Sequence, residues 1–179
     1  MDIRVRLHFM SPCGLLYEPH PTIGWFPDCY NAYQNILPAP VVILDHGIFI
    51  VPDSVQLLDQ LGPNFTGYLA AKKFNWKRLA GARVLTIGGL PAFDYIDKIA
   101  RTVSGNFLDH NIRVNSVVSS YRIVNTTFSQ RVGDLAGAIF LTQTSLKFSV
   151  IPVNSTIHET VDVPFVANLI GKPFTDGPS

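Results

Sequence analysis

Residues 81–103 carry the clearest change of hydrophobic pattern in the chain. Arg83–Ile87 is a short run rich in β-branched residues, which is typical of a buried strand. Gly88-Gly89 ends this run with two residues that accept positive φ, and Pro91 suits the start of a helix. The apolar positions that follow recur every three or four residues, at Phe93, Ile96, Ile99, Ala100 and Val103. The segment predicts a strand, a tight turn and an amphipathic helix.

A hairpin is predicted earlier in the chain. Val41–Leu44 and Ile48–Val51 are apolar runs on either side of Asp45-His46-Gly47. Gly47 would supply the left-handed position of a three-residue loop. Asp53 or Ser54 then suits the N-cap of a short helix that ends at Leu58.

A second hairpin is predicted near the other end of the chain. Ser145–Val153 and Thr160–Val166 are strand-like runs separated by a turn at Asn154-Ser155-Thr156. Alternation along the returning strand places Val161, Val163 and Phe165 on one face.

The other segments lack a clear period. We expect an irregular, proline-rich arm over residues 1–38, with a short helical piece at residues 28–35. Turns or surface segments are expected at residues 61–66, 67–78, 104–113 and 131–137, and residues 114–124 fit neither period. The elements together predict an α+β fold in which residues 39–167 form one domain and residues 168–179 a disordered tail.

Composition and charge narrow the partners. The chain has 179 residues, of which 47% are hydrophobic and 15% charged, enough for one domain with a sizeable core. A net charge of +1 provides no field for nucleic acid, and no apolar run reaches the roughly 20 residues of a membrane span. High apolar content leaves a homo-oligomer open. Residues 1–11 lack the apolar core of a secretory signal, so the sequence as given predicts a cytoplasmic or already processed protein.

The two cysteines, Cys13 and Cys29, leave two alternatives open. An oxidising compartment would favour a disulfide, and the cytosol would favour two free thiols. Neither cysteine has a second Cys or His pair at zinc-ligand spacing, so we expect no metal site and no cofactor.

Candidate chemistry concentrates in a polar stretch after the predicted helix. Asn106, Asp109, His110 and Arg113 are candidate ligand-binding residues, and His110 and Asp109 are also candidate catalytic residues together with His46. The alternative is a solvated loop whose side chains cap nearby backbone groups. Further candidates for the lining of a pocket are Trp76, Tyr121 and Arg131.

Four segments carry a resemblance to a known family. The order of strand, Gly-Gly turn, helix and later hairpin resembles a PDZ-like domain, with RVLTIGGLPAFDYIDKIAR at residues 83–101 as its strand-turn-helix. SPC at residues 11–13, DCYNAYQNILP at 28–38 and GNFLDHNIRVNSVVSSY at 105–121 resemble the amino-terminal half of fungal secreted serine peptidases. These belong to the tail-specific (carboxyl-terminal-processing) protease family and are related to the chlamydial protease-like activity factor. The resemblance implies a PDZ-like, partly open barrel or sandwich with one or two packed helices.

The sequence departs from that family in its catalytic half. The family places its nucleophilic serine and base in a domain downstream of the PDZ-like region, and the given sequence ends at Ser179 before such a domain. No catalytic residue can be transferred. Three N-glycosylation triplets, at Asn64, Asn125 and Asn154, are consistent with a secreted ancestry.

Two classes of function follow. In the first, the chain is a non-proteolytic PDZ-like scaffold that binds a peptide or an apolar small molecule in a groove beside the helix at residues 91–103. In the second, the same pocket serves a small-molecule enzyme of cyclase or isomerase type in fungal secondary metabolism. An open strand edge beside the helix favours the scaffold, and a closed aromatic cavity with convergent polar groups favours the enzyme.

Overall fold

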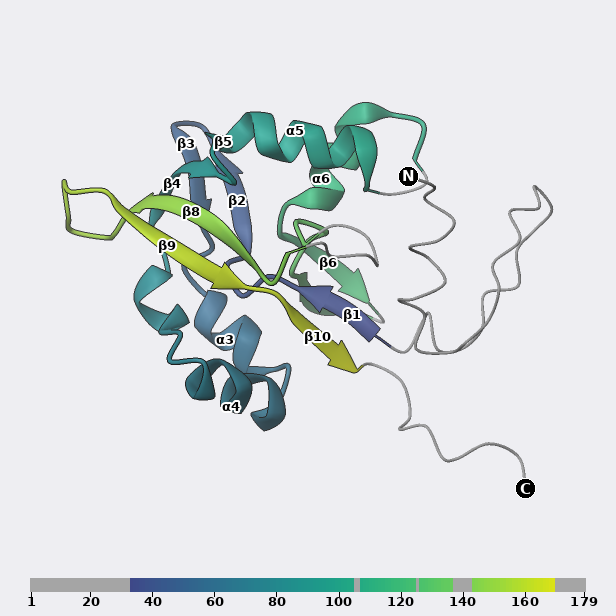
Figure 1. Cartoon of the computed structure of the whole chain (residues 1–179). Helices are drawn as coiled ribbons and strands as arrows, with labels where there is room; N and C mark the ends of the chain where they lie inside the picture. The colour runs from purple at the N-terminus through teal and green to yellow at the C-terminus, as the bar shows by residue number, and fades with distance from the viewer. Residues whose placement is uncertain (1–32, 105–106, 125, 137–142, 170–179) are drawn as a thin grey trace, which may run out of the picture. The chain divides into compact units, whose positions relative to one another are not determined.

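The computed structural model describes residues 33–104, 107–124, 126–136 and 143–169 (Figure 1). Residues 35–168 form one compact unit, and residues 1–34 with 169–179 are a separate one. Cys13, Cys29, Asn106 and the predicted tail beyond residue 169 lie outside the described residues.

The largest sheet is antiparallel and has six strands. Its order is β2-β3-β4-β8-β9, and the short strand β5 also pairs with β4. The strands are β2 (Val41–Leu44), β3 (Gly47–Ile50), β4 (Arg83–Ile87), β5 (Leu90–Pro91), β8 (Ser145–Ile151) and β9 (Glu159–Pro164). Within the described residues, β2 and β9 are therefore the strands at the two ends of this order.

Two small sheets accompany the large one. Strand β1 (Tyr33–Ile36) pairs with β10 (Val166–Leu169), and β6 (Ser120–Val124) pairs antiparallel with β7 (Thr127–Arg131). The helices are α3 (Ser54–Asp59), α4 (Pro63–Ala71), α5 (Ala92–Thr102) and α6 (His110–Val117), with a 3₁₀ turn at Trp76–Leu79. This mixture of antiparallel sheets and helices confirms the predicted α+β class.

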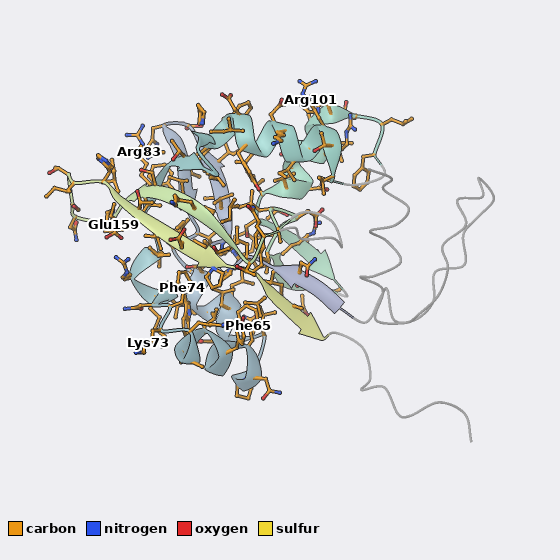
Figure 2. All side chains as sticks on the ribbon, in the orientation of Figure 1. Phe65, Lys73, Phe74, Arg83, Arg101 and Glu159 are labelled. Carbon is orange, nitrogen blue, oxygen red and sulfur yellow. The ribbon has the colours of Figure 1, made fainter. Side chains whose placement is uncertain are left out.

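Two hydrophobic clusters form the core. The larger joins the inner face of the six-stranded sheet to α5, with Ile96, Phe148 and Val163 fully buried. The smaller cluster joins α3, α4 and the 3₁₀ turn, where Phe65 and Trp76 are buried. Phe74 packs against both clusters and therefore connects them; Figure 2 labels it near Phe65.

The predicted strand, Gly-Gly turn and helix are confirmed. β4 ends at Ile87, Gly88 and Gly89 have φ of 58° and 82°, and α5 begins directly after Pro91. The apolar stripe is narrower than predicted, because Phe93 and Val103 are exposed while Ile96, Ile99 and Ala100 are buried. The predicted shared face of Val161, Val163 and Phe165 is also confirmed, since all three side chains are buried.

Several local predictions were wrong. The first hairpin has a two-residue loop, Asp45-His46, because Gly47 pairs with Leu44 instead of lying in the loop. A helix, α4, occupies much of the region expected to be turn and mixed surface, since Pro63 starts it and Phe65 and Leu69 bury one side. Residues 33–36 form a strand, so the helical piece expected at 28–35 does not extend over them.

Candidate binding groove

A hollow of about 330 Å³ lies beside the first turn of α5. The β2–β3 hairpin, the middle of β4 and the start of α5 contribute its lining. The main apolar lining residues are Ile43, Leu44, Ile48, Val84, Leu85 and Phe93. Their side chains make the hollow a place for an apolar group rather than for a solvated charge.

The pairing of β4 explains why the hollow forms there. On one side β4 pairs with β8 along most of its length. On the other side Val84 pairs with β3, whereas Thr86 and Ile87 pair with β5. Leu85 lies between these two short pairings, where β3 begins and β5 ends, so the sheet has a notch at this residue.

The exposed wall of the groove is apolar. Ile43 is 37% exposed, Leu44 45% and Phe93 52%, although all three are large hydrophobic side chains. Arg83 is the ionisable residue in the lining, and Gly47 leaves room for it, because a Cβ at position 47 would lie 3.3 Å from Arg83 Nε. The groove thus offers apolar contact and one guanidinium, but no acid, base or nucleophile.

The outer edge of β2 borders this groove. Leu44 and Gly47 flank a two-residue loop and form a hydrogen-bonded pair. Because the hydrogen-bonding direction alternates along an antiparallel strand, the N–H and C=O groups of Val41 and Ile43 point away from β3. The Ser119 N–H donates to the Val41 carbonyl at 2.7 Å and occupies the start of this edge. An incoming strand would therefore find its backbone partner at Ile43.

The opposite edge of the sheet carries residues that disfavour strand addition. Glu159 and Asp162 place charge on β9, and Pro164 cannot donate a backbone hydrogen bond. Strand β2, with the sequence VVIL, has none of these features. The two edges thus differ in their readiness to accept another strand.

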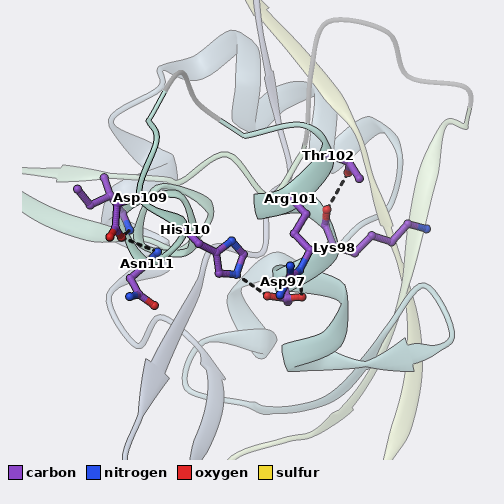
Figure 3. A network of polar contacts seen from close by, with 8 residues as sticks. Asp97, Lys98, Arg101, Thr102, Asp109, His110 and Asn111 are labelled. Atoms are coloured by element: carbon purple, nitrogen blue, oxygen red, sulfur yellow. Dashed lines mark hydrogen bonds and ion pairs between the residues drawn. The ribbon is translucent and has the colours of Figure 1, made fainter.

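The predicted polar cluster forms a separate network between α5 and α6 (Figure 3). His110 Nε2 lies 2.6 Å from Asp97 Oδ1, and Arg101 Nε donates to Asp97 Oδ2 at 2.7 Å. These contacts, with that of Arg101 the larger, lower the pKa of the Asp97 carboxyl below its ordinary value of 3.8. The network joins the two helices through an ionised Asp97.

Asp109 is a helix cap. Its Oδ1 accepts hydrogen bonds from Asn111 N at 2.8 Å and Ile112 N at 3.1 Å, which satisfies two free N–H groups at the start of α6. The alternative expectation of a capping side chain is therefore confirmed for Asp109. The expected turn over residues 104–113 was wrong from residue 110 onward, because this cap begins a helix.

His110 lacks the geometry of a general base. An accessible ring nitrogen is required, but Nε2 faces Asp97, and Nδ1 is buried without a hydrogen-bond partner among the described residues. Arg113 Nε is buried in the same way. In this arrangement the pair His110–Asp97 links the two helices.

Of the other predicted site residues, Tyr121 and Arg131 lie on the paired strands β6 and β7, whereas His46 and Trp76 lie in other parts of the chain. His46 is exposed at the hairpin tip, with its ring centroid 5.0 Å from that of Phe49. The Tyr121 hydroxyl donates to Asp53, which raises the pKa of Tyr121, and Arg131 pairs with Asp134 at 2.5 Å. Trp76 belongs to the smaller core cluster. None of these residues lines the groove.

The groove residues themselves were missed by sequence reasoning. Phe93 was assigned to the buried stripe, and Ile43, Leu44 and Arg83 were treated only as parts of strands. A usable signal was present in the uncharged run VVIL, since edge strands normally carry a charge or a proline.

The described residues contain no cluster of three or more His, Cys, Asp or Glu side chains placed to hold a metal ion. In the same part of the chain, no helix has the length and apolarity to cross a bilayer. No protein-family model matches the chain, and neither a curated protein nor a solved structure matches it.

Proposed function

We propose that this chain is a non-proteolytic, PDZ-like binding scaffold of serine-peptidase descent that binds a short extended peptide in the groove beside α5. The observation that carries the proposal is the apolar hollow between Ile43 on the edge strand β2 and Phe93 on α5. A peptide laid along β2 would hydrogen-bond to the backbone of Ile43 and place a side chain in the hollow.

The composition of the groove favours an apolar peptide with an acidic group. Exposed aliphatic and aromatic side chains at Ile43, Leu44 and Phe93 would bury apolar surface on binding. Arg83 would pair with a carboxylate, either a side chain or the carboxyl terminus of the peptide. Because the Ser119 N–H already donates to the Val41 carbonyl, a bound peptide could form few backbone hydrogen bonds with β2. Most of its affinity would therefore come from the side chain that it places in the hollow.

The small-molecule enzyme is the weaker candidate. Cyclisation or isomerisation by proton transfer needs an acid or base at the substrate, and the lining of the groove includes no Asp, Glu, His, Cys, Tyr or Lys side chain to supply one. Two of the polar residues expected at such a site have structural roles instead, since His110 contacts Asp97 across two helices and Asp109 caps α6. A passive apolar pocket therefore supports binding more than turnover.

The test is fluorescence anisotropy with short fluorescein-labelled peptides that end in Leu, Ile, Val or Phe, each made with a free and an amidated carboxyl terminus. Phe93→Ala should weaken binding about fivefold or more, which corresponds to roughly 1 kcal/mol at an interface anchor. Phe107→Ala is the matched control, since Phe107 is similarly exposed but does not line the groove.

Arg83→Gln should remove the preference for a free carboxylate, and Lys147→Gln, on the neighbouring strand, should retain it. Equal losses in Phe93→Ala and Phe107→Ala, or no binding by any peptide, would exclude the groove as a peptide site. A small molecule retained through native mass spectrometry of protein from its source cells would favour the second candidate.

A further inference from the structure

Two of the three N-glycosylation triplets begin in the described part of the chain, and these two differ in their structural setting. Asn125 lies outside the described residues, so the comparison is between Asn64 and Asn154. N-glycosylation attaches a bulky sugar to the side chain of an Asn-X-Ser/Thr triplet, and such acceptors lie on surface loops. Both asparagines are exposed, but only Asn154 is in a loop.

Asn154 lies in the loop that joins β8 to β9. Its φ is 62°, and neither it nor Thr156, which is also exposed, makes a hydrogen bond to a described side chain or backbone group. The turn is held by Ser155, whose Oγ accepts from Ile157 N at 3.1 Å. The acceptor amide and the threonine hydroxyl that an oligosaccharyltransferase must reach are therefore both free.

Asn64 has a less favourable setting. It is in the first turn of α4, and the middle residue of its triplet, Phe65, is buried in the smaller core cluster. The Thr66 hydroxyl is directed back to the carbonyls of Gly62 and Pro63, at 3.4 Å from each. All three residues of this triplet therefore belong to α4, and the Thr66 hydroxyl contacts helix carbonyls.

Apolar side chains flank Asn154 on the surface. Val153 is 56% exposed and Ile157 76%, although neither lines the groove. The loop that presents the acceptor thus also presents two aliphatic groups to solvent. A sugar attached at Asn154 would cover part of this apolar surface.

We infer that Asn154 is an N-glycosylation site. The transfer forms a bond between Asn154 Nδ2 and the anomeric carbon of the sugar, and it breaks the bond from that carbon to the diphosphate of a lipid-linked oligosaccharide donor. Nδ2 loses one proton, and the lipid diphosphate leaves. The inference requires passage through the secretory pathway, so it agrees with the already processed protein that the sequence left open and not with a cytoplasmic one.

The test is peptide mapping by mass spectrometry of the protein purified from the cells that make it, before and after treatment with peptide-N-glycosidase. The peptide containing Asn154 should carry hexosamine before treatment and an aspartate in place of Asn154 afterwards. An unmodified Asn154 peptide as the sole species would overturn the inference.

Matched variants expressed in the same cells separate the triplet from the fold. Thr156→Ala should abolish the modification, whereas Thr156→Ser, which preserves the triplet, should keep it. Asn154→Gln alone is a poorer test, because glutamine tolerates the positive φ at this position less well than asparagine. Persistence of the sugar on this peptide in Thr156→Ala would also contradict the inference.

Discussion

At the scale of single residues, Asp97 organises the contact between α5 and α6. One carboxylate oxygen faces His110 and the other accepts from Arg101, so Asp97 bridges its own helix and the next. Because Arg101 is largely exposed, its ion pair with Asp97 contributes little to the free energy of unfolding. The main effect of the network is to position the two helices. It fixes the start of α6 beside the middle of α5.

Asp97→Asn should change how stability depends on pH. The folded-state pKa of Asp97 is lowered, so its contribution is fully present above the ordinary value of 3.8 and is lost as the pH falls through the lower folded value. The difference in Tm between wild type and Asp97→Asn should be largest near neutral pH and shrink below about pH 4. Thermal melts by circular dichroism would measure it.

Asp94→Asn, on the same helix, is the control and should leave the pH profile close to that of the wild type. A difference in Tm between wild type and Asp97→Asn that stays constant down to about pH 2 would contradict the role assigned to the carboxylate.

At the scale of elements, helices and strands with a clear local sequence pattern were predicted correctly, and those without one were not. The β4, Gly-Gly and α5 segment was predictable because its strand propensity, glycine positions and apolar period agree. Helix α6 was not, since its sequence HNIRVNSV has almost no apolar face and depends on the Asp109 cap and on packing against α5. Tertiary contacts supply what its local sequence lacks.

Ile96→Ala and Phe93→Ala should separate the two faces of α5. Ile96 is fully buried in the larger cluster, so its truncation should cost about 2–5 kcal/mol of unfolding free energy. Phe93 is half exposed, so its truncation should cost less than about 1 kcal/mol. Urea denaturation monitored by circular dichroism gives both values, and similar losses would place Phe93 in the core instead of the groove wall.

Gly133→Ala and Gly67→Ala should change stability in opposite directions. Gly133 has φ of 92°, and a Cβ there would lie 2.5 Å from the Val117 carbonyl oxygen, so we expect a loss of about 2 kcal/mol or more. Gly67 is inside α4 with open space around it, so alanine should add about 0.5–1 kcal/mol. The same urea measurement applies, and a neutral Gly133→Ala would show that the backbone near Val117 yields easily.

At the scale of the whole molecule, the groove depends on neighbours that no local pattern reveals. Ile43 and Phe93 are far apart in the sequence and meet because β3 and β5 share one side of β4. Composition predicted one domain with a sizeable core, and the expectation of a groove beside the helix came from the PDZ-like resemblance. Neither could place the groove at the notch by Leu85, because strand order decides that position.

The hydrogen bond from Ser119 to Val41 limits how the protein can aggregate. Fibrils grow when identical strands stack along an uninterrupted edge, each offering all its backbone groups to the next. On the edge strand β2, the Val41 carbonyl already accepts a hydrogen bond from Ser119. On the edge strand β9, the residues Glu159, Asp162 and Pro164 disfavour the addition of another strand. A short peptide can therefore bind beside Ile43, whereas neither edge offers the continuous row of free backbone groups that a growing fibril needs.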